Sequence, residues 1–183
     1  MKNNKKYQEA FLSMTKHRSI FLNENFDKEM SAVLTALLIY FDSKSNDPIK
    51  IYINSNGGDL SAMYQVYDTM QMVKSPISTI CMGKAYSAGA VILSAGSKGL
   101  RHCMRNANIM IHGVQLVFPT MQDNDSENAE SYLKFVDSLN NGMLKILSKH
   151  TGQAFDKVKQ DCSRDLFLDP QKAIEYGIID SII

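Results

Sequence analysis

A short apolar stretch that ends at a glycine turn constrains the fold of this chain more than any other feature. Residues 49–53 (IKIYI) are rich in β-branched side chains and are followed by the turn sequence 54–58 (NSNGG), which predicts a strand ending at a tight turn. A helical pattern follows at about 60–73, and the next β-branched stretch covers 77–82. Strands and helices that alternate in this way predict an α/β fold with largely parallel, buried strands.

The remaining sequence supplies the other elements of this fold. In residues 27–41, apolar side chains recur every three or four positions, which is typical of an amphipathic helix. The last helix is bounded by Asp169 as N-cap, Pro170 in its first turn and Gly177 just past its end. Further strands are predicted at 19–22, 101–104, 109–112 and 178–183, and further helices at about 7–14, 87–95, 126–149 and 155–162.

Composition narrows the class of protein. The 183 residues show no linker and no shift in composition, so we expect one domain over residues 1–183. A formal net charge of +1 favours neither nucleic acid nor an anionic membrane as partner, and no apolar run reaches the ~18 residues that span a bilayer. The N-terminus lacks the apolar stretch of a secretory signal, and three cysteines without CxxC spacing are typical of reduced, buried thiols. The expected location is the cytoplasm.

One junction between a strand and a helix carries a candidate nucleophile. Residues 83–90 (GKAYSAGA) join a buried strand to an apolar helix, with Ser87 where the helix begins. Serine is a favoured N-cap, so this segment alone favours a structural role for Ser87 as much as a catalytic one. In the catalytic role, amide groups at the helix N-terminus would stabilise an oxyanion. The segment is not the GxSxG turn of α/β-hydrolases, because position 85 is alanine.

A serine nucleophile needs a base, and the chain offers four histidines. His17 and His150 lie in polar sequence that is typical of an exposed surface, and His102 is ambiguous. His112 ends an apolar strand, so its imidazole is expected at the carboxyl edge of the sheet, where active sites of open α/β sheets collect. A hydrogen-bonded core histidine remains the alternative for His112.

The group that orients the base is harder to identify from spacing. Asp161, Asp165 and Asp169 all lie near the last helix, and capping explains Asp169. Asp165 precedes the apolar residues 166–168, which favours its placement in a partly buried site. The pattern alone gives no more than a hint of this role.

A collinear series of segments resembles the ClpP family, the proteolytic subunits of the Clp protease. The resemblance extends from about Ile20 to the end of the chain, and its specificity lies in the number and order of the matching segments. These are 52–58 (YINSNGG), 67–71 (YDTMQ), 78–83 (STICMG), 85–90 (AYSAGA), 94–96 (SAG), 110–112 (MIH), 150–153 (HTGQ), 164–165 (RD) and 173–177 (AIEYG).

The resemblance implies a ClpP/crotonase-like spiral of ββα units with a protruding handle, a strand plus a long helix, at about 113–149. It implies that Ser87 is the nucleophile, His112 the general base and Asp165 the group that fixes the imidazole tautomer. The backbone N–H groups of Gly58 and Ala88 would form the oxyanion hole.

The resemblance also implies an assembly. Subunits of the family form seven-membered rings that stack as a tetradecamer around a closed chamber, and an AAA+ Clp ATPase delivers unfolded protein. ATP belongs to that partner, so no cofactor or metal is expected in this subunit, and neither nucleic acid nor a membrane is an expected partner. The leading function is therefore an endopeptidase that degrades unfolded protein in a homo-oligomeric chamber.

Four features depart from the family pattern. Residues 113–125, after the histidine, are longer and lack the usual Gln-Pro and Gly-Gly pairs. Ser163 replaces an acidic residue before Arg164, which the resemblance places at the ring interface, and residues 1–17 lack a recognisable axial-loop sequence. In the ATPase docking pocket Tyr52 is retained, whereas Lys50, Met72 and His102 stand where the family has aromatic residues.

These departures keep other functions open. One is a weakly active or silent structural subunit of a mixed ring, completed by a second ClpP-like paralogue. Another is a related phage-type capsid-maturation peptidase. A crotonase-type enzyme shares the fold but would have little use for a series of Ser, His and Asp.

Overall fold

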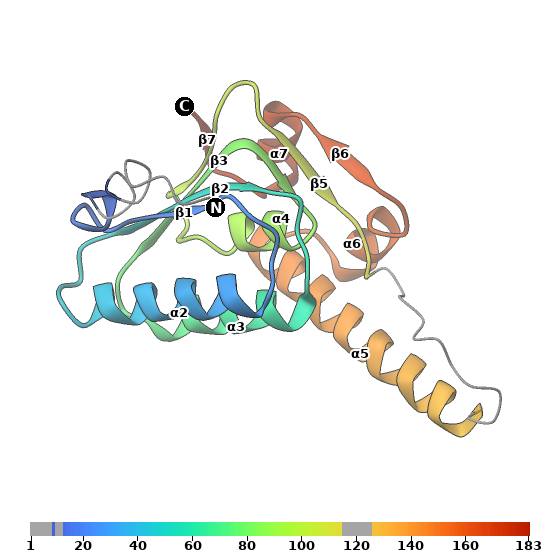
Figure 1. The fold of residues 1–183 in the computed structure, drawn as a ribbon. Coiled ribbons are helices and arrows are strands. Elements are labelled where there is room, and N and C mark those ends of the chain that lie inside the picture. The colour runs from blue at the N-terminus through green and yellow to red at the C-terminus, as the bar shows by residue number, and fades with distance from the viewer. Residues whose placement is uncertain (1–8, 10–12, 115–125) are drawn as a thin grey trace.

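One mixed sheet runs through the computed structural model, which describes residues 9, 13–114 and 126–183, without the side chains of 126–128 (Figure 1). Its strands are β1 (Ser19–Leu22), β2 (Ile49–Ser55), β3 (Ile77–Tyr86), β4 (Arg101–Cys103), β5 (Asn108–Ile111), β6 (Leu166–Leu168) and β7 (Ser181–Ile182). Strands β1, β2, β3, β4 and β7 lie side by side in this order, and their pairings are parallel. β5 pairs in parallel with β3, and β6 pairs antiparallel with β5. The predicted α/β fold with largely parallel strands is confirmed.

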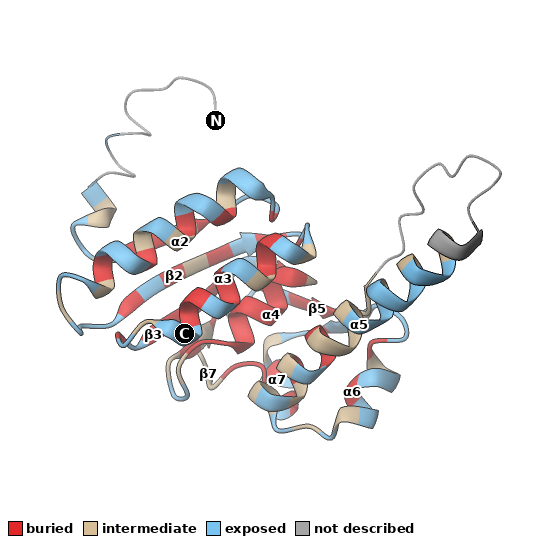
Figure 2. Cartoon of the chain, turned by 90° about the horizontal axis from the view of Figure 1, so that it is seen from below, coloured by how far each residue is buried: buried red, intermediate tan, exposed pale blue. Residues whose placement is uncertain are grey.

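Helices cover the face of the sheet on which the core lies (Figure 2). They are α2 (Lys28–Asp42), α3 (Leu60–Met72), α4 (Ala88–Ser94), α5 (Ser126–Thr151), α6 (Phe155–Asp161) and α7 (Pro170–Tyr176). In β2, the side chains of Ile49, Ile51 and Ile53 are fully buried in this core. Lys50 and Tyr52 alternate with them and point to the other face of the sheet, which is called the outer face below.

β3 changes its partner along its length. Residues 79–81 pair with β4, whereas residues 84–86 pair with β5. Gly83 lies between the two segments with a φ of +88°, a left-handed conformation that glycine adopts at little cost. Because of this bend, the carboxyl end of β3 leaves β4 and brings Ser87 next to β5.

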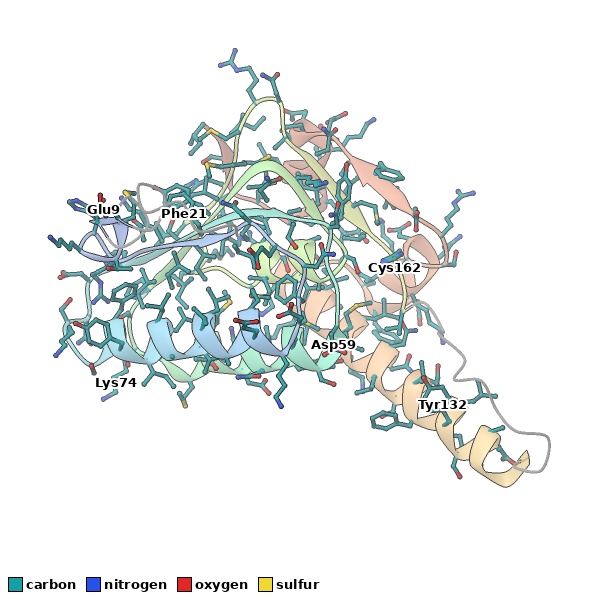
Figure 3. All side chains as sticks on the ribbon, in the orientation of Figure 1. Glu9, Phe21, Asp59, Lys74, Tyr132 and Cys162 are labelled. Carbon is teal, nitrogen blue, oxygen red and sulfur yellow. The ribbon has the colours of Figure 1, made fainter. Side chains whose placement is uncertain are left out.

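α5 projects from the body of the molecule (Figure 1), and Figure 3 shows Tyr132 on its projecting part. Its C-terminal half is anchored in the core by Met143, Leu144 and Leu147, whereas Phe135 in the other half is 58% exposed. This helix fits the handle predicted for about 113–149. Residues 115–125, where the departure after His112 was noted, lie outside the described residues.

The helix ends follow local signals in the sequence. Asp27, Asp59 and Asp169 each precede a helix and accept a hydrogen bond from the backbone amide three residues later. The predicted punctuation of α7 is confirmed, with Pro170 in its first turn and Gly177 past its end at a φ of +90°. A Cβ on Gly177 would overlap the carbonyl of Thr151, so only glycine fits there.

A buried ion pair holds β4 and β7 to the end of α5. Arg101 Nη2 lies 2.5 Å from Asp180 Oδ1, and Arg101 Nη1 also donates to the carbonyls of His150 and Gly177. Burial alone would raise the pKa of Asp180, but hydrogen bonds from Arg101 outweigh it, and the pKa lies below its ordinary value. The pair therefore stabilises the fold above the carboxyl's ordinary pKa, and this contribution is lost as the pH falls through the lowered pKa.

Some strand predictions were wrong in extent. β3 continues to Tyr86 rather than ending at 82, because the strand pairs with β5 after the glycine at 83, where the apolar pattern is interrupted. β7 covers only two of the residues predicted at 178–183, and β6 was not predicted as a strand. The predicted helix at 7–14 lies mostly outside the described residues. In the ranges that are described, no helix is both long enough and apolar enough to cross a membrane.

Candidate active site

Ser87 stands between β3 and α4 in an unusual backbone conformation. Its φ is +54° and its ψ is −120°, a region that non-glycine residues rarely occupy. Its backbone is held on both sides, since its N–H donates to the Met110 carbonyl at 2.8 Å and its C=O accepts from Ala90 at 2.9 Å. The hydroxyl makes no capping hydrogen bond to α4. The N-cap alternative therefore does not account for the side chain.

The Ser87 hydroxyl instead contacts His112. Ser87 Oγ lies 2.8 Å from His112 Nε2, and His112 Nδ1 lies 3.1 Å from Asp165 Oδ1. With the imidazole proton on Nδ1, the ring donates to the carboxylate and accepts from the hydroxyl. This is the arrangement in which a serine can transfer its proton to a neutral imidazole.

The register of β5 and β6 explains how His112 and Asp165 meet. Ile111 pairs with Leu166 at the end of the antiparallel ladder, so the next opposing positions are 112 and 165. The side chain of His112 is 14% exposed and that of Asp165 is 50% exposed. Asp165 is thus more open to solvent in the isolated chain than the partly buried site predicted from its apolar neighbours.

Two glycines bring the turn after β2 against Ser87. Gly57 has a φ of +98°, and a Cβ on it would lie 2.7 Å from Ser87 Cβ and 3.2 Å from Ala88 N. Gly58 has a φ of +143° and lies against Phe26, with which it forms an isolated bridge. Ala88 is the first residue of α4, and the first amides of a helix have no partner within it. The turn at Gly57 therefore packs directly against Ser87 and the Ala88 amide.

Gly57 and Tyr86 are two residues of this site that the sequence analysis did not single out. The signal for Gly57 was present in the glycine pair at 57–58, of which only the second was given a role. Tyr86 precedes Ser87, and its ring meets Phe167 edge-on with centroids 5.9 Å apart. Nothing in the local pattern indicated that contact, because it depends on β6.

Arg164 and Ser163 lie next to Asp165. Both are exposed, and in the described part of the chain Arg164 forms no ion pair. The Ser163 hydroxyl donates to the Gln160 carbonyl at 2.7 Å, at the end of α6. The Ser163 hydroxyl therefore binds the backbone at the end of α6 rather than the side chain of Arg164.

The four residues predicted for ATPase docking are only partly brought together. Tyr52 and His102 lie in one row of the sheet, both paired with Ile80, and Lys50 lies two residues before Tyr52. Met72, 65% exposed, ends α3 in the helical layer on the other side of the sheet. Within one chain, Lys50, Tyr52 and His102 therefore lie together on the sheet, whereas Met72 lies apart from them.

Two other histidines have partners unrelated to Ser87. The exposed position predicted for His150 was wrong: it is half-buried, and Nε2 lies 3.1 Å from the Tyr67 hydroxyl. Burial, and then the nearby charges of Lys149 and Arg101, lower its pKa to about 4, so it is neutral at pH 7. His102 Nδ1 lies 2.8 Å from Ser181 Oγ. The neighbouring carboxylate, Asp180, is engaged by Arg101 rather than by His102.

The cysteines are free and buried, as predicted for reduced thiols. Burial first, and then the Asp161 charge, raises the pKa of the Cys162 thiol to about 12, so this thiol is not a nucleophile at neutral pH. Among the described residues no group of three or more His, Cys, Asp or Glu side chains could hold a metal ion.

A comparison with models of known protein families gives one finding. Residues 2–183 match the model of the family described as Clp protease. The match covers essentially the whole chain, including the segments that carry Ser87, His112 and Asp165.

Proposed function

Since the chain belongs to the Clp protease family, whose members are serine peptidases, we propose that Ser87, His112 and Asp165 form its catalytic triad. The observation that carries the proposal is the continuous series of contacts from Ser87 Oγ through the imidazole to the Asp165 carboxylate, at 2.8 and 3.1 Å. The strained backbone of Ser87 supports it, because such strain clusters at functional sites.

In the proposed reaction the Ser87 oxygen attacks the peptide carbonyl while His112 Nε2 takes the hydroxyl proton. The carbonyl oxygen becomes an oxyanion, which the amides of Gly58 and Ala88 stabilise. His112 then gives the proton to the leaving amine, and an ester links Ser87 to the acyl group. Water, activated by His112, hydrolyses this ester and restores the Ser87 hydroxyl. Asp165 stays ionised and stabilises the imidazolium. No cofactor is proposed for the subunit.

The rest of the proposal follows from the family. Residues 1–183 would form one peptidase domain, and copies would assemble in heptameric rings stacked as a tetradecamer. A Clp ATPase of the AAA+ class would use ATP to deliver unfolded protein, which the subunit cleaves as an endopeptidase in the cytoplasm. We propose docking of that ATPase at the surface of Lys50, Tyr52, Met72 and His102.

Labelling with a fluorophosphonate tests the assignment. The reagent reacts with an activated serine, so we expect one adduct, on Ser87, when the labelled protein is digested and mapped by mass spectrometry. An adduct on a different serine would contradict the triad.

A second candidate function is a silent structural subunit of a mixed ring. The exposure of Asp165 favours it, since a half-exposed carboxylate orients an imidazole less firmly than a buried one. A protein that assembles with a ClpP-like paralogue but takes up no fluorophosphonate would support this candidate over the first.

The pH dependence of peptide hydrolysis is the first prediction. Only the neutral imidazole of His112 accepts the Ser87 proton, so kcat/KM is expected to fall toward acid pH, where the imidazole is protonated. Initial rates with a fluorogenic peptide between roughly pH 5 and 8 measure it. An unchanging kcat/KM across that range would mean that another group is the base.

The second prediction concerns ring stacking. Arg164 is exposed without an ion pair among the described residues, and Ser163 supplies no charge. Ser163→Glu is expected to stabilise double rings, because the new carboxylate can pair with Arg164 across the ring interface. A charge-assisted hydrogen bond of this kind is about twice as strong as a neutral one, and it would recur in every subunit. Sedimentation velocity at micromolar concentration should show a larger share of double rings than for the unmodified protein.

Ser163→Gln is the matched control for this prediction. It loses the same hydroxyl contact to Gln160 and gains similar bulk, but it adds no charge. If the unmodified protein already forms double rings that salt does not dissociate, the missing acid at position 163 is not what limits stacking.

A further inference from the structure

Asp165 has little of the structure to hold it in place. Its side chain is half exposed, and the strand that follows it, β6, is only three residues long. β6 lies at the edge of the sheet, paired with β5 alone among the described strands. Short edge strands open locally at low cost in free energy. The position of Asp165 therefore depends on whatever fixes β6 to the rest of the sheet.

An aromatic contact crosses from β6 to β3. Tyr86 pairs with Met110, and Met110 pairs with Phe167, so the three form one row across β3, β5 and β6. All three point to the outer face, because their neighbours Ala85, Ile109 and Leu168 are buried in the core. The rings of Tyr86 and Phe167 meet edge-on over this row, at an interplanar angle of 89°. This is a favourable geometry for two aromatic rings.

The row lies directly beside the candidate triad. Tyr86 immediately precedes Ser87, Met110 lies two residues before His112, and Phe167 lies two residues after Asp165. Ser87, His112 and Asp165 therefore lie just beyond the ends of β3, β5 and β6, within two residues of the row in each case. In this row Met110 is 8% exposed, whereas Phe167 is 58% exposed.

We infer that Tyr86 and Phe167 are positioning residues: their ring contact holds β6 against β3 and so keeps Asp165 within reach of His112. The inference deepens the proposed function and rests on the triad assignment. Neither ring needs to touch substrate for this role. Tyr86 acts through Phe167 and β6, and Phe167 acts through the backbone that it shares with Asp165.

Tyr86→Ala tests the inference. Loss of the ring contact frees β6, and a displacement of the carboxylate of about 1 Å is enough to lower kcat; we expect a fall of roughly tenfold with little change in KM. Tyr86→Phe keeps the ring and is expected to restore the rate.

Partner and control variants separate this role from others. Phe167→Ala should reproduce the effect, and the double variant should be no worse than either single variant within about twofold, because both remove one contact. Tyr40→Ala is the control, since Tyr40 is 54% exposed on α2 and its ring contacts Phe41, away from β6, so its loss should change nothing. A rise in KM with an unchanged kcat would make Tyr86 a wall of the substrate site and overturn the inference.

Hydrogen exchange supplies a measurement that does not depend on activity. In Tyr86→Ala, the amides of residues 166–168 are expected to exchange at least about tenfold faster than in the unmodified protein, while those of β2 keep their rates. If the unmodified protein hydrolyses no peptide, the proposed function fails and exchange alone decides the inference. Unchanged exchange in β6 overturns the inference whether or not the protein is active.

Discussion

Replacing Ser87 with alanine is expected to abolish peptide hydrolysis, with kcat falling by roughly 10⁴- to 10⁶-fold. The substitution removes only the oxygen that forms the ester, and the imidazole of His112 cannot replace it. His112→Ala should cost nearly as much, because without a base the hydroxyl is a weak nucleophile. The double variant should be no slower than the single ones, since members of a triad act as a unit. Steady-state hydrolysis of a fluorogenic peptide measures all three.

The fold is expected to survive Ser87→Ala. Both backbone groups of Ser87 keep their hydrogen bonds, to Met110 and from Ala90. Circular dichroism and the sedimentation coefficient should therefore match those of the unmodified protein. Full activity in a purified Ser87→Ala protein would remove the serine-peptidase assignment, and a loss of folding would show that Ser87 has a structural role that its contacts do not indicate.

Elements with local signals could be predicted from the sequence. Alternating isoleucines and a glycine turn predict β2, and a capping aspartate, a proline and a final glycine predict α7. These signals act within a few residues, so the elements can be predicted from them without knowledge of the tertiary structure. The position of His112 at the end of a parallel strand follows in the same way, from the apolar run before it.

The partner of His112 could not be derived in this way. β6 has only three residues, and one of them is 58% exposed. A pattern this short does not predict a strand. Asp165 becomes the neighbour of His112 only once β6 pairs antiparallel with β5, a contact between residues about fifty positions apart. The resemblance to the ClpP family supplied this residue, and the structure supplies a physical reason for its place.

The prediction that His150 is exposed was wrong for a different reason. Its sequence neighbours are polar, which predicted exposure, but the end of α5 packs against α3, and Tyr67 contacts the imidazole. The Arg101 side chain also donates to the His150 carbonyl. Burial at a helix end is decided by the elements that pack on it, and a pattern along one helix does not contain that information.

Gly57→Ala is expected to lower kcat/KM by about 10²-fold, a smaller loss than that expected for Ser87→Ala or His112→Ala. An added Cβ would lie 2.7 Å from Ser87 Cβ and 2.9 Å from the Tyr86 carbonyl oxygen, and both neighbours belong to the turn that presents the nucleophile. Because backbone cannot move aside as a flexible side chain can, the turn itself has to shift. Peptide hydrolysis and the fluorophosphonate labelling rate should fall together.

Gly99→Ala is the matched control. Gly57 has a φ of +98° and Gly99 a φ of +86°, so an alanine is strained at either position. The two sites differ in their neighbours, because nothing lies within 4 Å of a Cβ on Gly99. Each substitution should lower the free energy of unfolding by about 1 kcal/mol through that strain. Only Gly57→Ala should also slow catalysis, since only its Cβ presses on Ser87. Equal losses of activity in the two variants would mean that general strain, rather than displacement of the nucleophile, explains the effect.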